Sequence, residues 1–398
     1  MTLIELLVVI SIILLLAAAT LPRLKPAIEE RRLREASRAV HLIFNAARQA
    51  AISSGRPAGV MIERLTTVDL ANPSNPPQVI QPSCSMLLTQ VQVPPPYAGD
   101  TLSANATVSA PSDIPNWPGF KMFTVTFYED FGPTAAAPSA ALYPGDRIQF
   151  NMQGPWYVLG DPDADPAVPL SDRTSPKTML PMHLDCRRGE MVPWPVSWGA
   201  TLARLPYQIL RKPIKSGATP LQLPAGTVVD LPMSGQGADA ATVTDASSGT
   251  GSTVPVDLSN PQHNPKNWAA GAAPIIVMFS PSGSVERVLY PEFPEGRGKP
   301  AEPDSFSTIY LLIGRRDKMD PDCPRPSGYL PSANLYVDTA KPDTSERVLT
   351  NLWVAINPRT GMVTTESVAP RDPLNPQDQT KDHNPRRFAR EGQNMGGR

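Results

Sequence analysis

The first 21 positions of the chain are almost uniformly apolar, and Glu5 is the only charged residue among them. The run shows no polar face, which is not the pattern of an amphipathic helix packed on a core. A helix of that length measures about 32 Å, close to the hydrocarbon thickness of a bilayer. The pattern therefore predicts a transmembrane helix over residues 1–21.

Two ordinary explanations of this segment each leave one feature unexplained. A cleaved secretory signal fits the small residues Ala17–Ala19, but no basic residue precedes the apolar run. A plain membrane anchor fits the length, but a carboxylate near a membrane is costly, which makes Glu5 a candidate functional residue. The alternative without a function is a Glu5 that stays hydrated at the level of the lipid headgroups.

After the apolar run the pattern becomes that of an amphipathic helix. Pro22 and Pro26 each remove a helical N–H bond and predict a kink or break there. Gly55 followed by Pro57 predicts the end of the helix. Residues 22–54 are therefore expected to continue the first helix outside the membrane. Small and apolar residues recur there at a spacing of three or four: Ala36, Val40, Ile43, Ala47 and Ala50.

Beyond Gly55 the apolar positions fall in short runs, several of them alternating, and proline is frequent. The chain holds 48 prolines among 398 residues, and proline disfavours helix interiors and central strands. Alternation with β-branched and aromatic residues predicts short strands. They are expected at 58–62, 121–128, within 146–159 and at 307–313, with hairpins at 274–290 and 351–368.

The predicted fold class is α+β. It consists of a long N-terminal helix, with a membrane half and an amphipathic half, packed on an antiparallel β-sheet domain with long Pro-rich loops. Residues 55–370 are expected to form one β-rich globular domain. Within it, 71–118 and 216–273 are expected to be loop insertions because they are poor in large apolar residues. The polar tail 371–398 is expected to be disordered.

The N-terminal sequence Met-Thr-Leu-Ile-Glu-Leu-Leu-Val-Val-Ile resembles the start of mature type IV pilins and type II secretion pseudopilins. Glu5 matches the acidic residue of that family, and Pro22 matches its proline just past the membrane. Gly55-Arg56-Pro57 with Val60 is similar to the entry into the first strand of H-type minor pseudopilins, which are usually much shorter. The resemblance is good only as far as about Gly55.

This resemblance implies a non-enzymatic filament subunit. A prepilin peptidase would cut just before Met1, the new amine would be methylated, and an inner-membrane assembly platform would extract the chain into a pseudopilus or pilus. A cationic Met1 amine and the Glu5 carboxylate of a neighbouring subunit would attract each other strongly in low dielectric and set the register. The implied location is the inner membrane, single-pass, with the C-terminal domain in the periplasm and other pilin subunits as partners.

The long insertions favour a minor or priming subunit, because bulky loops would obstruct repeated packing along a fibre. Two other functions stay open. A pilin-like adhesin would bind a surface or a glycan through the insertions. A membrane-anchored exported enzyme would need a convergent polar site.

Charge narrows the possible partners. The chain has 36 Lys and Arg against 37 Asp and Glu, so nucleic acid is not expected as a partner. From Arg23 to Arg64 the sequence contains nine basic and four acidic residues, which gives this segment a net charge of +5. This excess fits contact with anionic headgroups of the lipid bilayer, and it equally fits a solvated helix face.

No catalytic residue is predicted, because no zinc-protease, serine-hydrolase or nucleotide-binding motif is present. The cysteines Cys84, Cys186 and Cys323 allow at most one disulfide, and three unpaired thiols are the alternative.

One acidic cluster raises the question of a metal. Asp161, Asp163 and Asp165 occupy positions 1, 3 and 5 of a sequence similar to a calcium-binding loop, but Pro166 stands where glycine is expected. Calcium is thus the one cofactor that the sequence suggests, and a solvated acidic turn is the alternative.

Overall fold

A computed structural model describes residues 3–67, 78–109, 111–113, 120–160, 170, 178–185, 204–244, 251–257, 275–289, 308–319, 334, 351–368 and 386–396. The chain divides into two compact units. The first comprises residues 1–90, 217–290 and 302–398. The second comprises residues 91–216 and 291–301.

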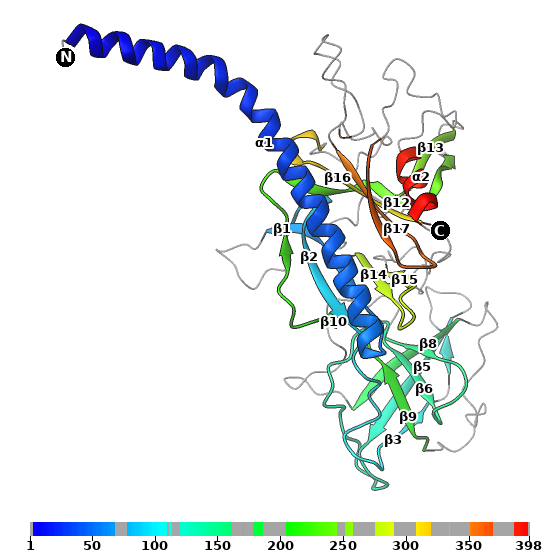
Figure 1. Ribbon diagram of the computed structural model, residues 1–398. Coiled ribbons are helices and arrows are strands. Elements are labelled where there is room, and N and C mark those ends of the chain that lie inside the picture. Colours follow the sequence, from blue (N-terminus) through cyan, green and yellow to red (C-terminus); the bar gives the residue numbers. More distant parts are fainter. Residues whose placement is uncertain are drawn as a thin grey trace. The chain divides into compact units, whose positions relative to one another are not determined.

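The first unit contains helix α1 and a large sheet (Figure 1). Along the main path the strands follow the order β15-β14-β1-β2-β12-β16-β17-β18, and every pairing given for it is antiparallel. The bounds are α1 Leu3–Ser54, β1 Ala58–Thr67, β2 Gln78–Gln92, β11 Leu221–Gln222, β12 Thr227–Thr244, β13 Gly251–Asp257, β14 Ile275–Phe279, β15 Val285–Leu289, β16 Ile309–Arg315, η4 Arg316–Lys318, β17 Leu352–Ile356, β18 Val363–Ser367 and α2 Arg387–Gly396.

Alternation along β16 and β17 separates two apolar layers. Ile309, Leu311 and Ile313 belong to the core under α1, which also holds Phe44 and other α1 side chains. The alternating neighbours Tyr310 and Leu312 belong to a second cluster with Trp353 and Ala389 of α2. Because successive strand residues point to opposite faces, the two helices cover opposite faces of the sheet. Burial begins at Leu33: the side chains that the structure describes before it are exposed or half-buried.

The second unit is built on a separate sheet with its own core. Its strands follow the order β3-β5-β8-β7-β6-β9, with β4 paired to β5. The bounds are β3 Asn105–Val108, β4 Ser112–Asp113, β5 Phe120–Tyr128, β6 Arg147–Phe150, β7 Tyr157–Leu159, β8 Met179–Asp185 and β9 Tyr207–Leu210, and the short β10 Ile214–Lys215 pairs with the end of β2.

Two backbone hydrogen bonds close this sheet on itself. The amide of Ala106 donates to the carbonyl of Leu205 over 2.8 Å, and that of Leu205 donates back to Ala106 over 2.9 Å. They join the β3 edge to the residues just before β9, so these two outer strands are connected.

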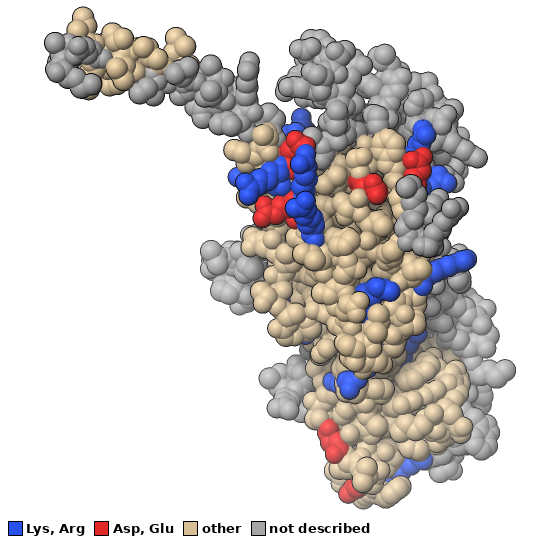
Figure 2. All heavy atoms as spheres, in the orientation of Figure 1, with Lys and Arg blue, Asp and Glu red and all other residues tan. Residues whose placement is uncertain are grey.

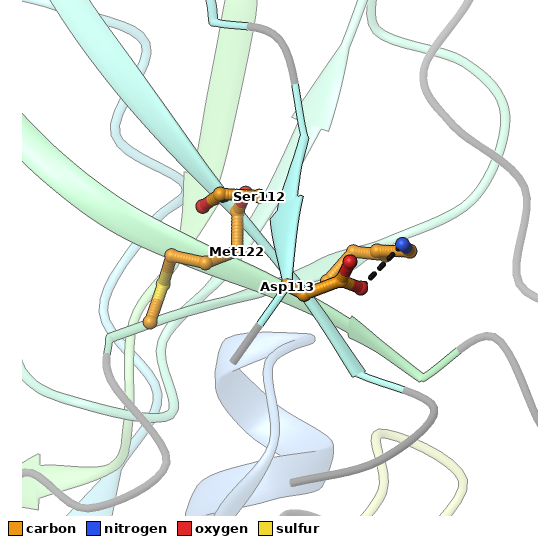
Figure 3. A network of polar contacts seen from close by, with 4 residues as sticks. Ser112, Asp113 and Met122 are labelled. Atoms are coloured by element: carbon orange, nitrogen blue, oxygen red, sulfur yellow. Dashed lines mark hydrogen bonds and ion pairs between the residues drawn. The ribbon is translucent and has the colours of Figure 1, made fainter. Parts of the chain in front are cut away.

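The short strand β4 is held by side chains as well as by its ladder (Figure 3). The hydroxyl of Ser112 donates to the carbonyl of Met122 over 3.3 Å, and Asp113 forms an ion pair with Lys121. The Asp113 side chain is 81 % exposed, so this pair fixes a strand edge at the surface and contributes little to stability.

The expected fold class needs correction. Instead of a helix on one β-sheet domain, the described residues form mainly antiparallel strands in two sheets, and the chain divides into two compact units. The expected membrane half is not found either: within the residues described, no helix is long and apolar enough to cross a membrane. Proline does not always mark a loop in this chain. Pro181 lies within β8, and Pro232 lies within β12, where the register shifts.

Several predicted elements are confirmed and others are wrong. The strand at 121–128 and the hairpins at 274–290 and 351–368 are present as β5, β14–β15 and β17–β18. The supposed loop insertions instead contain strands: β2 to β4 fall within 71–118 and β11 to β13 within 216–273. The C-terminal tail, expected to be disordered, contains α2.

Candidate functional site

The N-terminal part of α1 presents a continuous apolar surface. Nine large side chains are between 47 % and 70 % exposed: Ile4, Leu6, Leu7, Val8, Val9, Ile10, Ile12, Leu14 and Leu15. The hydroxyl of Ser11 donates to the carbonyl of Leu7 over 2.8 Å, so this polar group is satisfied within the helix. A surface of this kind is costly in water and marks a site of contact with another apolar partner.

The C-terminal part of α1 is packed on the sheet and holds the apolar segment in place. Its buried residues recur at helical spacing: Leu33, Ala36, Val40, Phe44, Ala47 and Ala51. The rings of Phe44 and Phe279 meet edge to face, with centroids 6.4 Å apart. Ala36, Ala47 and Ala51 are small, which lets the helix approach the strands closely.

Charged side chains gather on and beside α1 on the face of the first unit that Figure 2 shows. Arg34 forms an ion pair with Glu30 one turn away on the same helix. Glu29 accepts a hydrogen bond from Arg315 at the end of β16, with 2.5 Å between Oε2 and Nη1. Both side chains of the second pair are about three-quarters covered, 25 % and 29 % exposed, which makes this contact less solvent-screened than a surface pair.

Beside the Glu29–Arg315 pair lies an open groove of about 660 Å³. Arg32 and Arg316 line it from α1 and η4. Within the part of the chain that the structure describes, neither guanidinium has a hydrogen-bond or ion-pair partner. Leu33, Ala225 and Met319 supply apolar lining. The groove therefore combines unpaired cations with apolar surface.

A buried polar network holds β12 and β16 together further inside the first unit. The amide of Asn334 donates to Asp230 Oδ2 over 3.1 Å, and Asn334 Oδ1 accepts from the Arg315 amide over 2.9 Å. Ser234 accepts a hydrogen bond from the Leu312 amide over 2.9 Å. These bonds satisfy backbone groups at the register shift in β12, so the network explains structure and not chemistry.

A similar role falls to Asp146 in the second unit. Its carboxylate accepts 2.8 Å hydrogen bonds from the amides of Tyr143 and Lys212. Burial raises the pKa of this carboxyl, although those two bonds and the Lys212 charge act in the opposite direction. The paired backbone groups identify Asp146 as a clamp on two loops.

The sequence-predicted site residues are only partly covered by the structure. Met1 lies outside the described residues, and so do Asp161, Asp163 and Asp165. Glu5 and Pro22 fall within α1, which continues through Pro22 as one helix. The roles assigned to these residues stay predictions.

For the remaining chemistry the structure gives three placements. Cys84 is buried, whereas Cys186 and Cys323 lie outside the described residues. His183 is buried, with Nδ1 2.8 Å from the carbonyl oxygen of Gly160. Among the described residues, no group of three or more His, Cys, Asp or Glu is placed to hold a metal ion.

Sequence reasoning missed the groove beside α1. Arg315 and Glu29 are 286 positions apart, and nothing in the local pattern of either segment points to the other. The basic excess between Arg23 and Arg64 was the only signal, and it covered one wall of the groove.

Comparison with known proteins adds no family. No protein-family model matches the chain, and no curated protein and no solved structure matches it either. The exposed surface of α1 and the groove beside it are the features of this chain that bear on its function.

Proposed function

We propose that this protein is a non-enzymatic, pilin-like filament subunit, a minor or priming pseudopilin, that assembles through the N-terminal part of α1. The observation that carries the proposal is the run of nine exposed apolar side chains between Ile4 and Leu15. Fully burying one such side chain contributes about 1.5–3 kcal/mol. If equivalent helices of neighbouring subunits covered all nine side chains, the burial would offset the large loss of translational and rotational freedom on association.

The split character of α1 supports the same role. From Leu33 onward the helix is fixed to the sheet of its own subunit, while the segment before Leu15 offers its apolar side chains to something else. Helices that pack side by side in a filament would bury this segment, and the folded units would remain outside. The resemblance at the N-terminus adds Glu5 as the residue that pairs with the Met1 amine of a neighbour.

Processing, partners and location belong to the same proposal. A prepilin peptidase would release Met1 for methylation, and an assembly platform would feed the chain into the filament. Before assembly the N-terminal part of α1 would be held in the inner membrane, with the C-terminal part in the periplasm. Cell fractionation tests the location: the untagged chain should sediment with inner membranes and resist extraction by carbonate.

The decisive experiment replaces Glu5 in the native host. Glu5→Ala should lower the amount of the chain recovered in sheared filaments or in cross-linked oligomers by at least tenfold, because the Met1 amine would lose its partner. Glu35→Ala is the matched control, since Glu35 is an exposed carboxylate of the same helix. Equal recovery of both variants would sink the filament role.

Mass spectrometry of the native N-terminus provides an independent check. An N-methylated Met1 is the expected result. An unmodified initiator Met, or a chain starting after Ala19, would contradict pilin processing.

A second function, adhesion through the second unit, is favoured by one observation. Leu102 is fully exposed and Phe131 is 78 % exposed. Their loops are neighbours, because the Ser103 hydroxyl donates to the carbonyl of Glu129 over 3.3 Å. Two exposed apolar side chains on adjacent loops form a small contact surface. Replacing both with serine should reduce attachment of cells to surfaces while leaving filament recovery unchanged.

A further inference from the structure

We propose that the groove between α1 and η4 binds the phosphate groups of anionic phospholipids. The groove is lined by three arginines, Arg32, Arg315 and Arg316, against two carboxylates, Glu29 and Asp317. Figure 2 shows that basic and acidic side chains gather around α1 on this face of the first unit.

The pairing of these charges leaves two cations available. Glu29 is engaged by Arg315 through the 2.5 Å contact. Arg32 and Arg316 have no hydrogen-bonded or ion-paired partner for their guanidiniums in the described part of the chain, and both are exposed. A guanidinium presents a planar fork of N–H donors that matches two oxygens of a phosphate. Two guanidiniums that line one groove therefore offer a phosphate group more N–H donors than either offers alone.

The rest of the lining fits a lipid better than a free ion. Ala225 provides exposed apolar surface in this lining, whereas Leu33 and Met319 are buried and add little to it. A glycerol backbone and the first methylenes of an acyl chain would cover such surface, whereas inorganic phosphate has no apolar part.

The position along α1 is consistent with a headgroup ligand. Leu21 ends the apolar run of the sequence, and Glu29 follows it by eight residues, or about 12 Å along a helix. The polar layer of a bilayer is roughly 5–8 Å thick on each side. Arg32 lies three residues further along, about 16 Å from Leu21, and its long side chain can reach back toward that layer.

Asp317 should weaken the binding of a phosphate, so changing it should have the opposite effect to changing the arginines. Its carboxylate lines the same groove and would repel a phosphate. Removing that charge should strengthen lipid binding, whereas removing Arg32 or Arg316 should weaken it. If the groove had only a structural role, replacing Asp317 and replacing the arginines would not change lipid binding in opposite directions.

This inference rests on the proposed function in one respect: the proposed function places the groove beside a bilayer. The experiment uses the full chain and vesicles made either of phosphatidylcholine alone or of equal parts phosphatidylcholine and phosphatidylglycerol. The measured quantity is the ratio of flotation with anionic vesicles to flotation with neutral ones, which cancels the contribution of the apolar helix segment. Filament recovery is scored separately, so failure of either proposal is distinguishable from failure of the other.

The wild-type ratio should exceed one, and Arg32→Gln with Arg316→Gln should lower it toward one, by up to about fivefold for each arginine lost. Asp317→Asn should raise it. The control Arg56→Gln with Arg359→Gln removes the same charge from two exposed positions elsewhere and should leave the ratio near that of the wild type.

Three outcomes would overturn the inference. The first is an unchanged ratio in the groove variant, and the second is an equal loss in the control variant. The third concerns the source of the phosphate: inorganic phosphate at low millimolar concentration that abolishes the preference for anionic vesicles would identify a free-phosphate site. Circular dichroism of every variant excludes unfolding as the cause.

Discussion

The guanidinium of Arg48 donates a hydrogen bond from Nε to the carbonyl oxygen of Gly283 over 3.1 Å. Arg48 belongs to α1, and Gly283 belongs to the turn between β14 and β15. The turn between β17 and β18 reaches the same place, because the Val285 amide donates to the carbonyl of Pro358 over 2.8 Å. One arginine thus fixes the end of the helix on the first hairpin, which is itself bonded to a second hairpin far away in sequence.

Replacing Arg48 should therefore loosen α1 from the sheet. Arg48→Met keeps most of the apolar stem and removes the half-buried hydrogen bond, which should cost about 1–2 kcal/mol of unfolding free energy. Arg38→Met, at an exposed position of the same helix, should change it by less than about 0.5 kcal/mol. Urea unfolding of the full chain in detergent provides the measurement. Similar values for the two variants would show that the Arg48 bond contributes nothing.

The contact between the two turns requires glycine for a steric reason as well as a conformational one. Gly361 and Gly55 share a φ of 63°. A Cβ at Gly361 would lie 1.9 Å from the Gly283 carbonyl oxygen, whereas a Cβ at Gly55 would meet nothing within 4 Å. Gly55→Ala should cost about 1 kcal/mol from the left-handed backbone alone. Gly361→Ala should cost about 1–3 kcal/mol more, because backbone must move.

The same urea titration separates these two contributions. The difference between the alanine variants isolates the clash, since the backbone strain is common to both. Equal stability losses would mean that the hairpin turns do not touch in solution.

The buried thiol of Cys84 should make the stability of the fold depend on pH. Burial raises the pKa of its thiol to about 11 from an ordinary 9.0, with the Asp230 charge acting in the same direction and Arg316 against it. The thiolate is thus favoured by unfolding, so the stabilising effect of the neutral buried thiol is complete below pH 9 and is lost between about pH 9 and 11. Cys84→Ala should flatten this part of the curve of stability against pH.

Chemical labelling gives a second measurement on the same residue. Iodoacetamide at pH 8 should leave the Cys84 peptide unmodified in the folded chain and modify it fully in urea, because reaction needs an accessible thiolate. Rapid labelling without denaturant would contradict the buried position. Peptide mapping by mass spectrometry resolves Cys84 from Cys186 and Cys323.

Local pattern was enough to locate individual strands but not their arrangement. The alternation in 121–128 predicted β5 because side chains on a strand face opposite sides with a period of two. The same reasoning could not show that β5 belongs to a second unit, since a unit is defined by pairings between distant segments. Residues 216–273 were predicted to be a loop because they are poor in large apolar residues, so β12 was missed; this strand accommodates Pro232 at a register shift.

The candidate site was predictable only where it is continuous in sequence. The apolar run before Leu15 is visible from composition alone. The groove depends on Arg315 and Arg316 arriving beside Glu29 and Arg32, which no periodicity indicates. The sequence therefore located the apolar surface of α1 but not the wall of the groove that Arg315 and Arg316 form.

The apolar part of α1 yields the prediction that best separates assembly from folding. Leu7 and Leu15 are 58 % and 70 % exposed, so Leu7→Ser with Leu15→Ser should leave the unfolding free energy within about 0.5 kcal/mol of the wild type. The same variant should lose self-association, because its apolar contact with neighbouring copies would be weakened. Leu33→Ser is the contrasting control: Leu33 is fully buried, and its replacement should cost several kcal/mol.

Analytical ultracentrifugation in detergent measures self-association, and urea unfolding measures stability, on the same samples. A loss of stability in the double variant would mean that these side chains pack within their own subunit, and an unchanged oligomer would remove the apolar surface as the basis of assembly.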